Sequence, residues 1–450
     1  MEMSPSHKKN LVRLLAILLT FTVINGTMFN VTIPDIAESF NLMPSQVSWV
    51  MTGYILVYAI GSVMYGKLAD VIPLKRLLTI GIILFSFGSI LGFLSPNYTT
   101  LLIARILQAL GGAAIPALGF IIPSRYFTHD RGKVFGIISS TVAFASGVGP
   151  IAGGLIGGFL DWRFLFLVPA SAALAIPLFR RWLPDEEVRS QKIDYFGAVL
   201  VAIFVASLLL FVTMLIWSLL IISIIAFALL VFHINRVDSP FIDPVLLKNR
   251  RYTITIFTSF LGTSVMFGLI FVLPIMMRDL YDATTLGIGL LLFPGAMAAG
   301  IFGRFGGTLI DKKGSIYVLR IALLLVAIGV FFISVFTSSS LLLLGSAVFI
   351  AYIGFPLLQS ATANLLSHML TKEETGVGMG LFNLSNFISG AFSSAIFGSI
   401  LDLEGMTFSI NPLNAHGDHA IYSNLYLVLS IVAVFALLMF FAFYNRSKKA

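Results

Sequence analysis

Long apolar stretches alternate with short polar breaks along almost the whole chain of 450 residues. An α-helix needs about 20 apolar residues to cross the hydrocarbon core of a bilayer. Fourteen stretches come close to or exceed that length, so the pattern predicts fourteen membrane-spanning helices. Their approximate limits are 11–33, 47–66, 77–95, 100–122, 134–158, 163–181, 197–215, 217–234, 253–276, 287–309, 316–336, 340–363, 377–400 and 424–444.

The apolar run 197–234 is unusually long and has no charged break. A single helix of this length would extend about 57 Å at 1.5 Å per residue. The hydrocarbon core is only about 30 Å thick. We therefore expect a turn near Trp217 and two spans in this region.

Composition supports a membrane protein, because 58% of the residues are hydrophobic and only 11% are charged. The net charge of +8 would suggest nucleic-acid binding in a soluble protein, but here membrane topology explains it. The absence of cysteine excludes disulfides, Cys-ligated metals and thiol catalysis. The first apolar run follows Lys8, Lys9 and Arg13 without a small-residue cleavage site, so we expect it to be a span and not a removable signal.

Basic residues gather in alternate loops, beginning with Lys67, Lys75 and Arg76. The opposite loops hold only Arg163 and Arg278 and are otherwise acidic. Cytoplasmic loops carry the excess of Lys and Arg in membrane proteins. This asymmetry predicts that both termini are cytoplasmic and that the number of spans is even. Twelve spans remain an alternative only if 197–234 does not cross.

The long loop at about 401–423 contains His416, Asp418 and His419. These residues suggest a metal site or a pH sensor, but their spacing matches no known ligand set. We expect a solvated loop there, no metal site, and no bound cofactor in the protein.

Two loops of the chain repeat one pattern. Gly66 and Asp70 follow the second span, and Gly307 and Asp311 follow the tenth. The two glycines are 241 positions apart, and so are the two aspartates. Such duplication builds transporters from two halves that rock about a central site. It predicts two six-helix bundles, at 1–196 and 253–450, with a two-helix insert and linker at 197–252.

Asp70 and Asp311 each lie among basic residues at the end of a predicted helix. An acid in that position can bind a neighbouring helix and its dipole, and so hold one conformation. The alternative is a solvated charged turn that only sets topology. Since the pattern occurs twice at matching places, we expect the two aspartates to take part in gating.

The fifth predicted span carries the sequence GVGPIAGGLIGG at 147–158. Proline removes a backbone donor, and glycines allow helices to approach closely. Such a segment is suited to helices that move against one another, so it predicts a hinge. The hinge residues are Gly147, Gly149, Pro150, Gly153 and Gly154.

Taken together, these motifs resemble those of the major facilitator superfamily over nearly the whole chain. The loop 307–314 matches its GxxxDKxG pattern, whereas the first loop has Val71 and Pro73 where the family usually has a base and a glycine. Arg105, Gln108 and Gly111 resemble its RxxQG pattern. The resemblance implies an all-α membrane fold of two six-helix bundles, here with two inserted helices.

Finer features resemble the fourteen-span drug:proton antiporters, and among them the Gram-positive tetracycline efflux proteins. They are the segments 25–34, 30–40 and 379–387 together with the glycine-rich segment 147–158. This resemblance implies efflux of drug-like compounds, including tetracycline, across a bacterial plasma membrane by alternating access. It implies antibiotic resistance as the outcome and protons as the coupling ion.

The chain departs from this group in the residues that would carry protons. The group has acids in the first span, and its tetracycline branch also in the fifth and thirteenth. Here Asn25, Ser146 and Ser389 stand in these regions, and no Asp or Glu falls within a predicted span. Three explanations stay open: coupling through acids at span ends such as Asp35 and Asp70, facilitation or exchange of another ion, and lost coupling with a different solute.

Arg105 is the charged residue that lies well inside a predicted span, and an intramembrane arginine is costly. We expect it either to modulate coupling or to serve as a structural hydrogen-bonding hub. Polar residues in otherwise apolar spans outline a substrate pathway. The pathway residues predicted for the central pocket are Asn25, Gln108, Asn383 and Asn386.

The leading hypothesis is therefore an exporter of small amphipathic drugs, with the lipid bilayer as its environment and no nucleic-acid partner. A facilitator of a metabolite is the alternative, which the missing carboxylates favour. A receptor is disfavoured because the loops are short. An enzyme is not expected, since no catalytic set, metal cluster or phosphate-binding loop is present among the spans.

Overall fold

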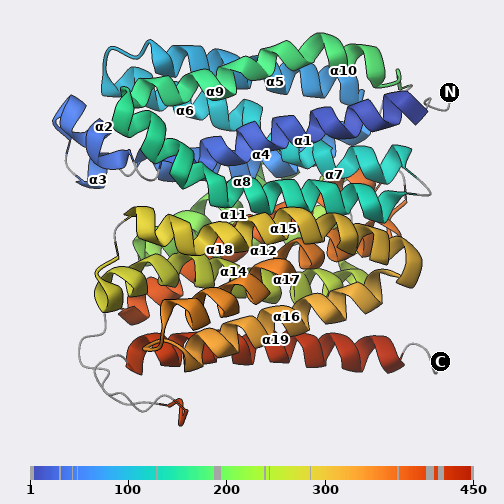
Figure 1. Ribbon diagram of the computed structural model, residues 1–450. Helices are drawn as coiled ribbons and strands as arrows, with labels where there is room; N and C mark the ends of the chain where they lie inside the picture. The colour runs from blue at the N-terminus through green and yellow to red at the C-terminus, as the bar shows by residue number, and fades with distance from the viewer. Residues whose placement is uncertain are drawn as a thin grey trace. The chain divides into compact units, whose positions relative to one another are not determined.

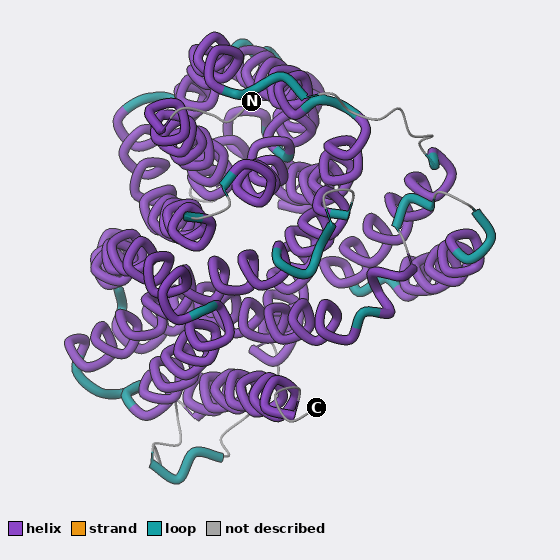
Figure 2. Tube along the Cα trace, turned by 90° about the vertical axis from the view of Figure 1, so that its right-hand side faces the viewer, coloured by secondary structure: helices purple, strands orange, loops and turns teal. Residues whose placement is uncertain are grey.

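In the computed structural model, all regular secondary structure among the described residues is helical (Figures 1 and 2). His416, Asp418 and His419 of the long loop lie outside these residues. The described ranges are 5–29, 32–42, 44–47, 49–127, 130–186, 194–237, 240–242, 244–283, 285–371, 374–401, 410–413 and 420–446.

Helices of the first half of the chain correspond to the first six predicted spans, and two of these spans are not simple helices. The fourth is formed by α6 and α7 in succession, and the sixth by a series of short 3₁₀ and α segments. The elements are α1 (Pro5–Met28), α2 (Ile33–Phe40), α3 (Pro44–Val47), α4 (Trp49–Val71), α5 (Leu74–Phe93), α6 (Tyr98–Gly112), α7 (Ala114–Tyr126), α8 (Arg131–Phe159), η2 (Trp162–Phe166), α9 (Leu167–Ala170), η3 (Ser171–Ala175) and α10 (Ile176–Trp182).

The broken sixth span has a sequence reason. Pro169 and Pro177 each lack a backbone donor, so a regular α-helical ladder cannot run through 162–182. The 3₁₀ segments η2 and η3 lie on either side of α9 in this region.

The remaining helices begin with the insert. They are α11 (Tyr195–Met214), α12 (Trp217–Ile234), α13 (Pro244–Lys248), α14 (Arg250–Tyr281), α15 (Thr285–Lys313), α16 (Ser315–Val335), α17 (Leu341–Ser367), α18 (Thr375–Leu401) and α19 (Ala420–Arg446). The turn expected near Trp217 is present, because Leu215 adopts a left-handed conformation (φ 55°) and α12 starts at Trp217.

Thirteen helical segments among the described residues are long and apolar enough to cross a membrane. Helix α18, of 27 residues, covers the thirteenth predicted span at 377–400. The prediction of an all-helical, multi-pass membrane protein is thus confirmed.

By their internal contacts the residues form two compact units. Unit 1 comprises 1–128, 148–249 and 370–384, and unit 2 comprises 129–147, 250–369 and 385–450. Two helices are divided between the units, α8 after Gly147 and α18 after Leu384. The predicted domain limits at 196 and 252 stay a prediction.

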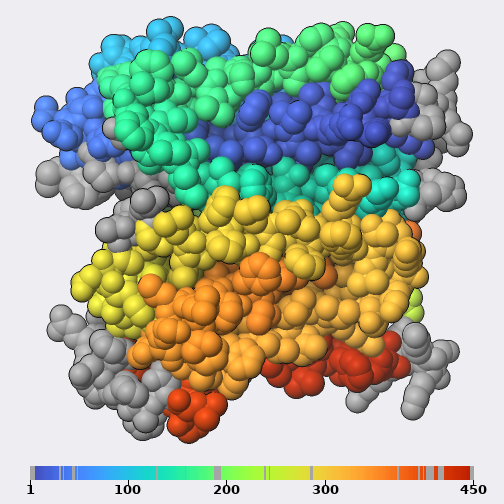
Figure 3. Space-filling model, viewed as in Figure 1, coloured from blue at the N-terminus to red at the C-terminus, as the bar shows by residue number. Residues whose placement is uncertain are grey.

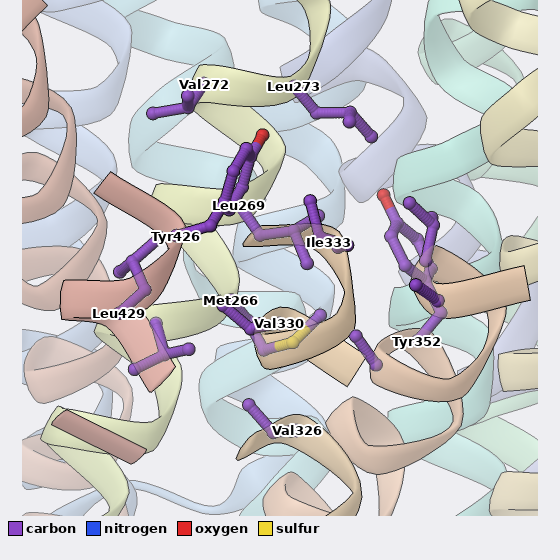
Figure 4. Close-up of a cluster of buried hydrophobic side chains, with 14 of the residues drawn as sticks. Met266, Leu269, Val272, Leu273, Val326, Val330, Ile333, Tyr352, Tyr426 and Leu429 are labelled. Atoms are coloured by element: carbon purple, nitrogen blue, oxygen red, sulfur yellow. The ribbon is translucent and has the colours of Figure 1, made fainter. Parts of the chain in front are cut away.

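The core of unit 2 is built by apolar faces of α14, α16, α17 and α19 (Figure 4). Met266, Val330 and Tyr426 are fully buried there. In unit 1, Phe29 and Phe166 pack edge to face at 4.7 Å within a second cluster. Each unit therefore has a buried apolar core of its own.

Candidate functional site

Arg105 of α6 is the centre of a buried polar cluster in unit 1. Arg105 is only 1% exposed. Nε donates to the carbonyl oxygen of Val50 at 3.1 Å, and Nη1 donates to Oε1 of Gln108 at 2.9 Å. The guanidinium lies between two aromatic rings, 4.3 Å from the centre of Phe29 and 4.0 Å from that of Tyr54. Cation–π contacts and neutral acceptors thus stabilise the charge.

The same cluster joins two predicted pathway residues. Gln108 Nε2 donates to Ser89 Oγ at 2.8 Å and reaches Asn25 Oδ1 at 3.5 Å. Asn25 Nδ2 in turn donates to the hydroxyl of Tyr54 at 3.2 Å. Asn25 and Gln108 are both fully buried. Asn25 therefore lies beside Arg105 and is held by hydrogen bonds to Tyr54 and Gln108. This arrangement favours a structural and positioning role for Asn25.

Unit 2 has an amide cluster of its own. Gln359 and Asn386 bond reciprocally, Asn386 Nδ2 to Gln359 Oε1 at 3.1 Å and Gln359 Nε2 to Asn386 Oδ1 at 3.3 Å. Gln359 Nε2 also donates to Thr263 Oγ1 at 3.1 Å. These groups stay neutral at every physiological pH, so the cluster can donate and accept hydrogen bonds but cannot carry a proton.

Asn383 differs from Asn386, although the two are one helical turn apart. Asn383 belongs to unit 1, is 4% exposed, and its Nδ2 has no hydrogen-bond partner among the described residues. A buried donor without a partner costs about 1–3 kcal/mol. Asn383 is therefore the predicted pathway residue with spare hydrogen-bonding capacity for a substrate.

Asp70 at the end of α4 is buried, with a side chain 3% exposed. Its Oδ1 accepts from Arg125 Nη2 at 2.9 Å and from the backbone N–H of Gly376 at 3.2 Å. Gly376 is the second residue of α18, so the carboxylate caps a helix N-terminus. The sequence pattern identified Asp70 but not Arg125, which lies 55 positions away in α7.

Glu186 completes this end of unit 1. It accepts from the Leu74 N–H at 3.0 Å and from the Tyr126 hydroxyl at 2.6 Å, and it lies 3.5 Å from Arg125 Nη1. Leu74 is the first residue of α5, and Pro73 before it provides no capping side chain. The residue that departs from the family pattern is thus compensated by a carboxylate from another loop.

Asp311 at the end of α15 has the matching role in unit 2. Its two oxygens accept from the N–H groups of Gly132 at 2.8 Å and Lys133 at 2.9 Å. Both belong to the first turn of α8. In each repeat, therefore, the loop aspartate caps the N-terminus of a helix from the other half of the sequence.

Glycines allow these helices to approach. A Cβ on Gly66 would lie 2.6 Å from the carbonyl oxygen of Gly376, and one on Gly307 would lie 2.5 Å from that of Gly132. Both caps use a second glycine four residues later, Gly136 and Gly380. Gly132 and Gly376 are 244 positions apart, as are Gly136 and Gly380, and this repeated spacing is the sequence signal that points to them.

The predicted hinge lies in a continuous helix, since α8 runs from Arg131 to Phe159. A Cβ on Gly147 would strike Ala296, and one on Gly149 would strike Thr27. Gly153 is buried, whereas Gly154 faces open space. The Pro150 side chain lies outside the described residues. Unit 2 gives way to unit 1 after Gly147, at the first residue of the motif.

Asp35 is exposed in the first turn of α2 and has no ion pair among the described residues. Its predicted coupling role stays a prediction.

Asp194 forms a further carboxylate cluster, at the base of the α11–α12 insert. It accepts from the N–H groups of Gly197 and Phe241 and contacts His233 Nε2 at 2.9 Å. Partial burial alone would raise the pKa of Asp194, but these hydrogen bonds outweigh it and leave the pKa lowered. The carboxylate is a clamp for both ends of the insert.

Comparisons with known proteins agree with this architecture. The riboflavin transporter RibZ of Clostridioides difficile is 26% identical over 443 residues, 95% of this chain and 96% of that protein. The multidrug efflux pump SdrM of Staphylococcus aureus is 26% identical over 444 residues, 94% of this chain and 97% of that protein. The structure of the proton:xylose symporter XylE has a TM-score of 0.70 at 16% identity, covering 97% of this chain and 96% of that one.

The likeness to XylE concerns the fold, and the family model is more specific. The model described as Major Facilitator Superfamily matches residues 15–394. This range includes both capping aspartates, Arg105 and most of both repeats. The chain therefore belongs to the major facilitator superfamily, whose members transport small molecules across membranes.

Proposed function

We propose that this protein exports drug-like amphipathic compounds across a bacterial plasma membrane, in exchange for protons and by alternating access. Both termini are cytoplasmic in this proposal. The observation that carries it is the pair of matched caps, Asp70 on the start of α18 and Asp311 on the start of α8. Two caps of one design, one in each repeat, suit a transporter that alternately closes and releases one end.

Export as the direction is supported by the likeness to SdrM over nearly the whole chain and by the glycine-rich segment of α8. Tetracycline as a substrate follows only from the motif resemblance. Coupling to protons would use acids at helix ends, because no Asp or Glu falls within a predicted span. Asp70 is the best placed of them, since it is buried and shares Arg125 with Glu186.

In this proposal Arg105 holds the substrate region of unit 1 in shape. Its contacts tie α6 to Val50 of α4 and, through Gln108, to Asn25 of α1. A substrate that displaces one of these amides would change the hydrogen bonds of the arginine directly. The spare donor of Asn383 is the second group that we assign to substrate contact.

Facilitated passage of a metabolite is the second candidate. It is supported by the likeness to the riboflavin transporter RibZ over 95% of this chain. The neutral amide cluster of Gln359 and Asn386 also fits a polar, uncharged solute.

Reconstitution with an imposed pH gradient distinguishes the two functions. Proteoliposomes that contain a trapped pH dye would receive tetracycline or riboflavin, and both solute flux and proton flux would be followed. Tetracycline-dependent proton movement supports the exporter, and riboflavin flux that ignores the gradient supports the facilitator. We expect Arg105→Ala to insert normally and to abolish the flux. If neither solute moves in the wild type, or if Arg105→Ala transports normally, the assignment of these substrates or of Arg105 is wrong.

A further inference from the structure

Two lipid-facing stripes meet in unit 2. Along α16, Tyr317, Leu324 and Ile328 are exposed at helical spacing, and α19 exposes Phe435, Leu438 and Phe441 in the same way. The two helices pack against each other, and their side chains are adjacent at the surface in Figure 3 (α16 amber, α19 red). Apolar stripes of this kind face acyl chains in a membrane protein.

Arg320 lies within the stripe of α16, three residues after Tyr317 and four before Leu324. Its Nη2 donates to Asn445 Oδ1 at 2.8 Å, and its guanidinium lies 4.6 Å from the ring centre of Phe441. Nε is buried and has no hydrogen-bond partner in the described part of the chain. Among the described residues no carboxylate is paired with Arg320, so its charge has no protein counterion there.

Arg320 lies near the start of α16, within reach of the polar interface for a side chain as long as that of arginine. It is the sixth residue of α16, about 7–8 Å along the helix at 1.5 Å per residue. Phe441 is equally close to the end of α19. An arginine so close to a helix end extends to the polar interface and pairs with what it finds there.

Other cations and aromatic rings surround this position. Lys313 Nζ lies 5.1 Å from the ring centre of Tyr317. Tyr444, whose hydroxyl contacts Thr255 at 2.8 Å, is within the electrostatic influence of Arg251. Of the acids at this end, Asp311 is engaged by backbone N–H groups of α8, and Asp130 lies near Asp311. Positive charge therefore dominates this end of unit 2.

Arg163 in unit 1 provides a contrast. It also lies over an aromatic ring, 4.5 Å from the centre of Trp162, but its Nη1 is paired with Asp161 at 3.2 Å. The stacked arginine of unit 1 thus has a counterion, whereas the stacked arginine of unit 2 has none among the described residues.

We propose that Arg320, with Asn445 and the ring of Phe441, binds the phosphate of an anionic phospholipid at the junction of α16 and α19. The planar guanidinium offers N–H groups whose spacing fits two phosphate oxygens. The lipid supplies the missing negative charge, and its acyl chains cover the exposed stripes of both helices. Phosphatidylglycerol is preferred over phosphatidylcholine, because Lys313 and Arg251 add further attraction for net negative charge.

The test is native mass spectrometry of the full chain with phosphatidylglycerol or phosphatidylcholine added in equal amounts. We expect the wild type to retain one phosphatidylglycerol most tightly and Arg320→Gln to bind it at least tenfold more weakly. Arg163→Gln is the matched control, since it removes a stacked arginine that is already paired, and it should retain the lipid. Arg320→Lys keeps the charge but lacks the planar guanidinium, so its affinity for phosphatidylglycerol should lie between those of the wild type and Arg320→Gln.

Two results would overturn the proposal. The first is equal retention of phosphatidylglycerol by wild type and Arg320→Gln in protein that elutes as a folded monodisperse species. The second is binding of soluble glycerol 3-phosphate in place of the lipid with the same dependence on Arg320, which would make this a site for free phosphates. A melting temperature that rises with phosphatidylglycerol in wild type and Arg163→Gln, but not in Arg320→Gln, would support it independently of transport.

Discussion

Asp70 and Asp311 occupy matching places in the two repeats, but their surroundings differ. Asp70 is 3% exposed, is paired with Arg125 and shares that arginine with Glu186. Asp311 is exposed, and within the part of the chain that the structure describes it binds only the backbone N–H groups of Gly132 and Lys133. The two repeats have thus kept the helix cap and have not kept the ion pair.

This difference suggests that the two caps release at different free-energy costs. A buried charge pair is costly to break, because each partner is left without a counterion and with little water. An exposed carboxylate at a helix N-terminus contributes much less, since water replaces the lost bonds. We therefore expect the contact of Asp70 with α18 to be harder to break than the contact of Asp311 with α8.

The glycine contacts are the feature that both ends share, and replacing them should have the largest effect. In Gly66→Val or Gly307→Val the new side chain would meet a carbonyl oxygen of the partner helix. Overpacking costs about 1–3 kcal/mol, and we expect the upper end of that range because backbone atoms cannot rotate away. Both variants should lose transport in proteoliposomes, by a similar factor.

Gly154→Ala is the control for these variants. Gly154 lies in the glycine-rich segment of α8, and among the described residues no atom of a neighbouring helix is within 4 Å of its Cβ position, so transport should stay near the wild-type rate. Wild-type transport by Gly66→Val would contradict the close approach of α4 and α18. Loss in Gly66→Val alone would mean that the ends differ in packing as well as in charge.

These contacts also show how far the sequence could predict the site. The spans, the turn near Trp217 and both aspartates followed from local patterns, because hydropathy and a repeated motif are written in consecutive residues. Arg125 and Glu186 did not follow, since they come from other loops and contact Asp70 only through the fold. Asn386 was predicted as a pathway residue, but its pairing with Gln359 did not follow from the sequence, since the two residues belong to different helices and meet only through the fold.

Removing one carboxylate at a time should have a smaller effect and should show how the two helix caps differ in their contribution to stability. Asp70→Asn leaves Arg125 buried beside Glu186 at 3.5 Å, so we expect a loss of about 2–3 kcal/mol, below the 3–5 typical of a fully stranded partner. Asp311→Asn should cost about 0.3–1 kcal/mol, since it removes a negative charge at an exposed helix N-terminus. Apparent melting temperatures in one detergent would measure the difference.

Arg125→Gln in the Asp70→Asn background tests the ion pair itself. The double variant should be more stable than the sum of the single effects predicts, because no buried arginine is left without its aspartate, and Glu186 keeps its hydrogen bonds from the Leu74 N–H and the Tyr126 hydroxyl. Equal losses in Asp70→Asn and Asp311→Asn would remove the proposed asymmetry. Additive effects of Asp70→Asn and Arg125→Gln would mean that the ion pair contributes no coupling energy to stability.

The smallest effect that we expect concerns pH and unit 2. His368 directly follows α17, and burial together with the nearby charge of Arg131 lowers the pKa of its imidazole, while Asp311 opposes the shift. Because the folded state favours the neutral ring, unfolding takes up a proton below the ordinary histidine pKa of about 6.5, and stability falls as the pH falls. Between pH 7.5 and 5.5 the wild type should therefore lose more stability than His368→Gln, by less than the effect of Asp311→Asn. The same comparison in an Asp311→Asn background should show a larger pH effect, since the carboxylate that favours the charged ring is gone. An identical pH dependence in wild type and His368→Gln would mean that acid does not act on this end through His368.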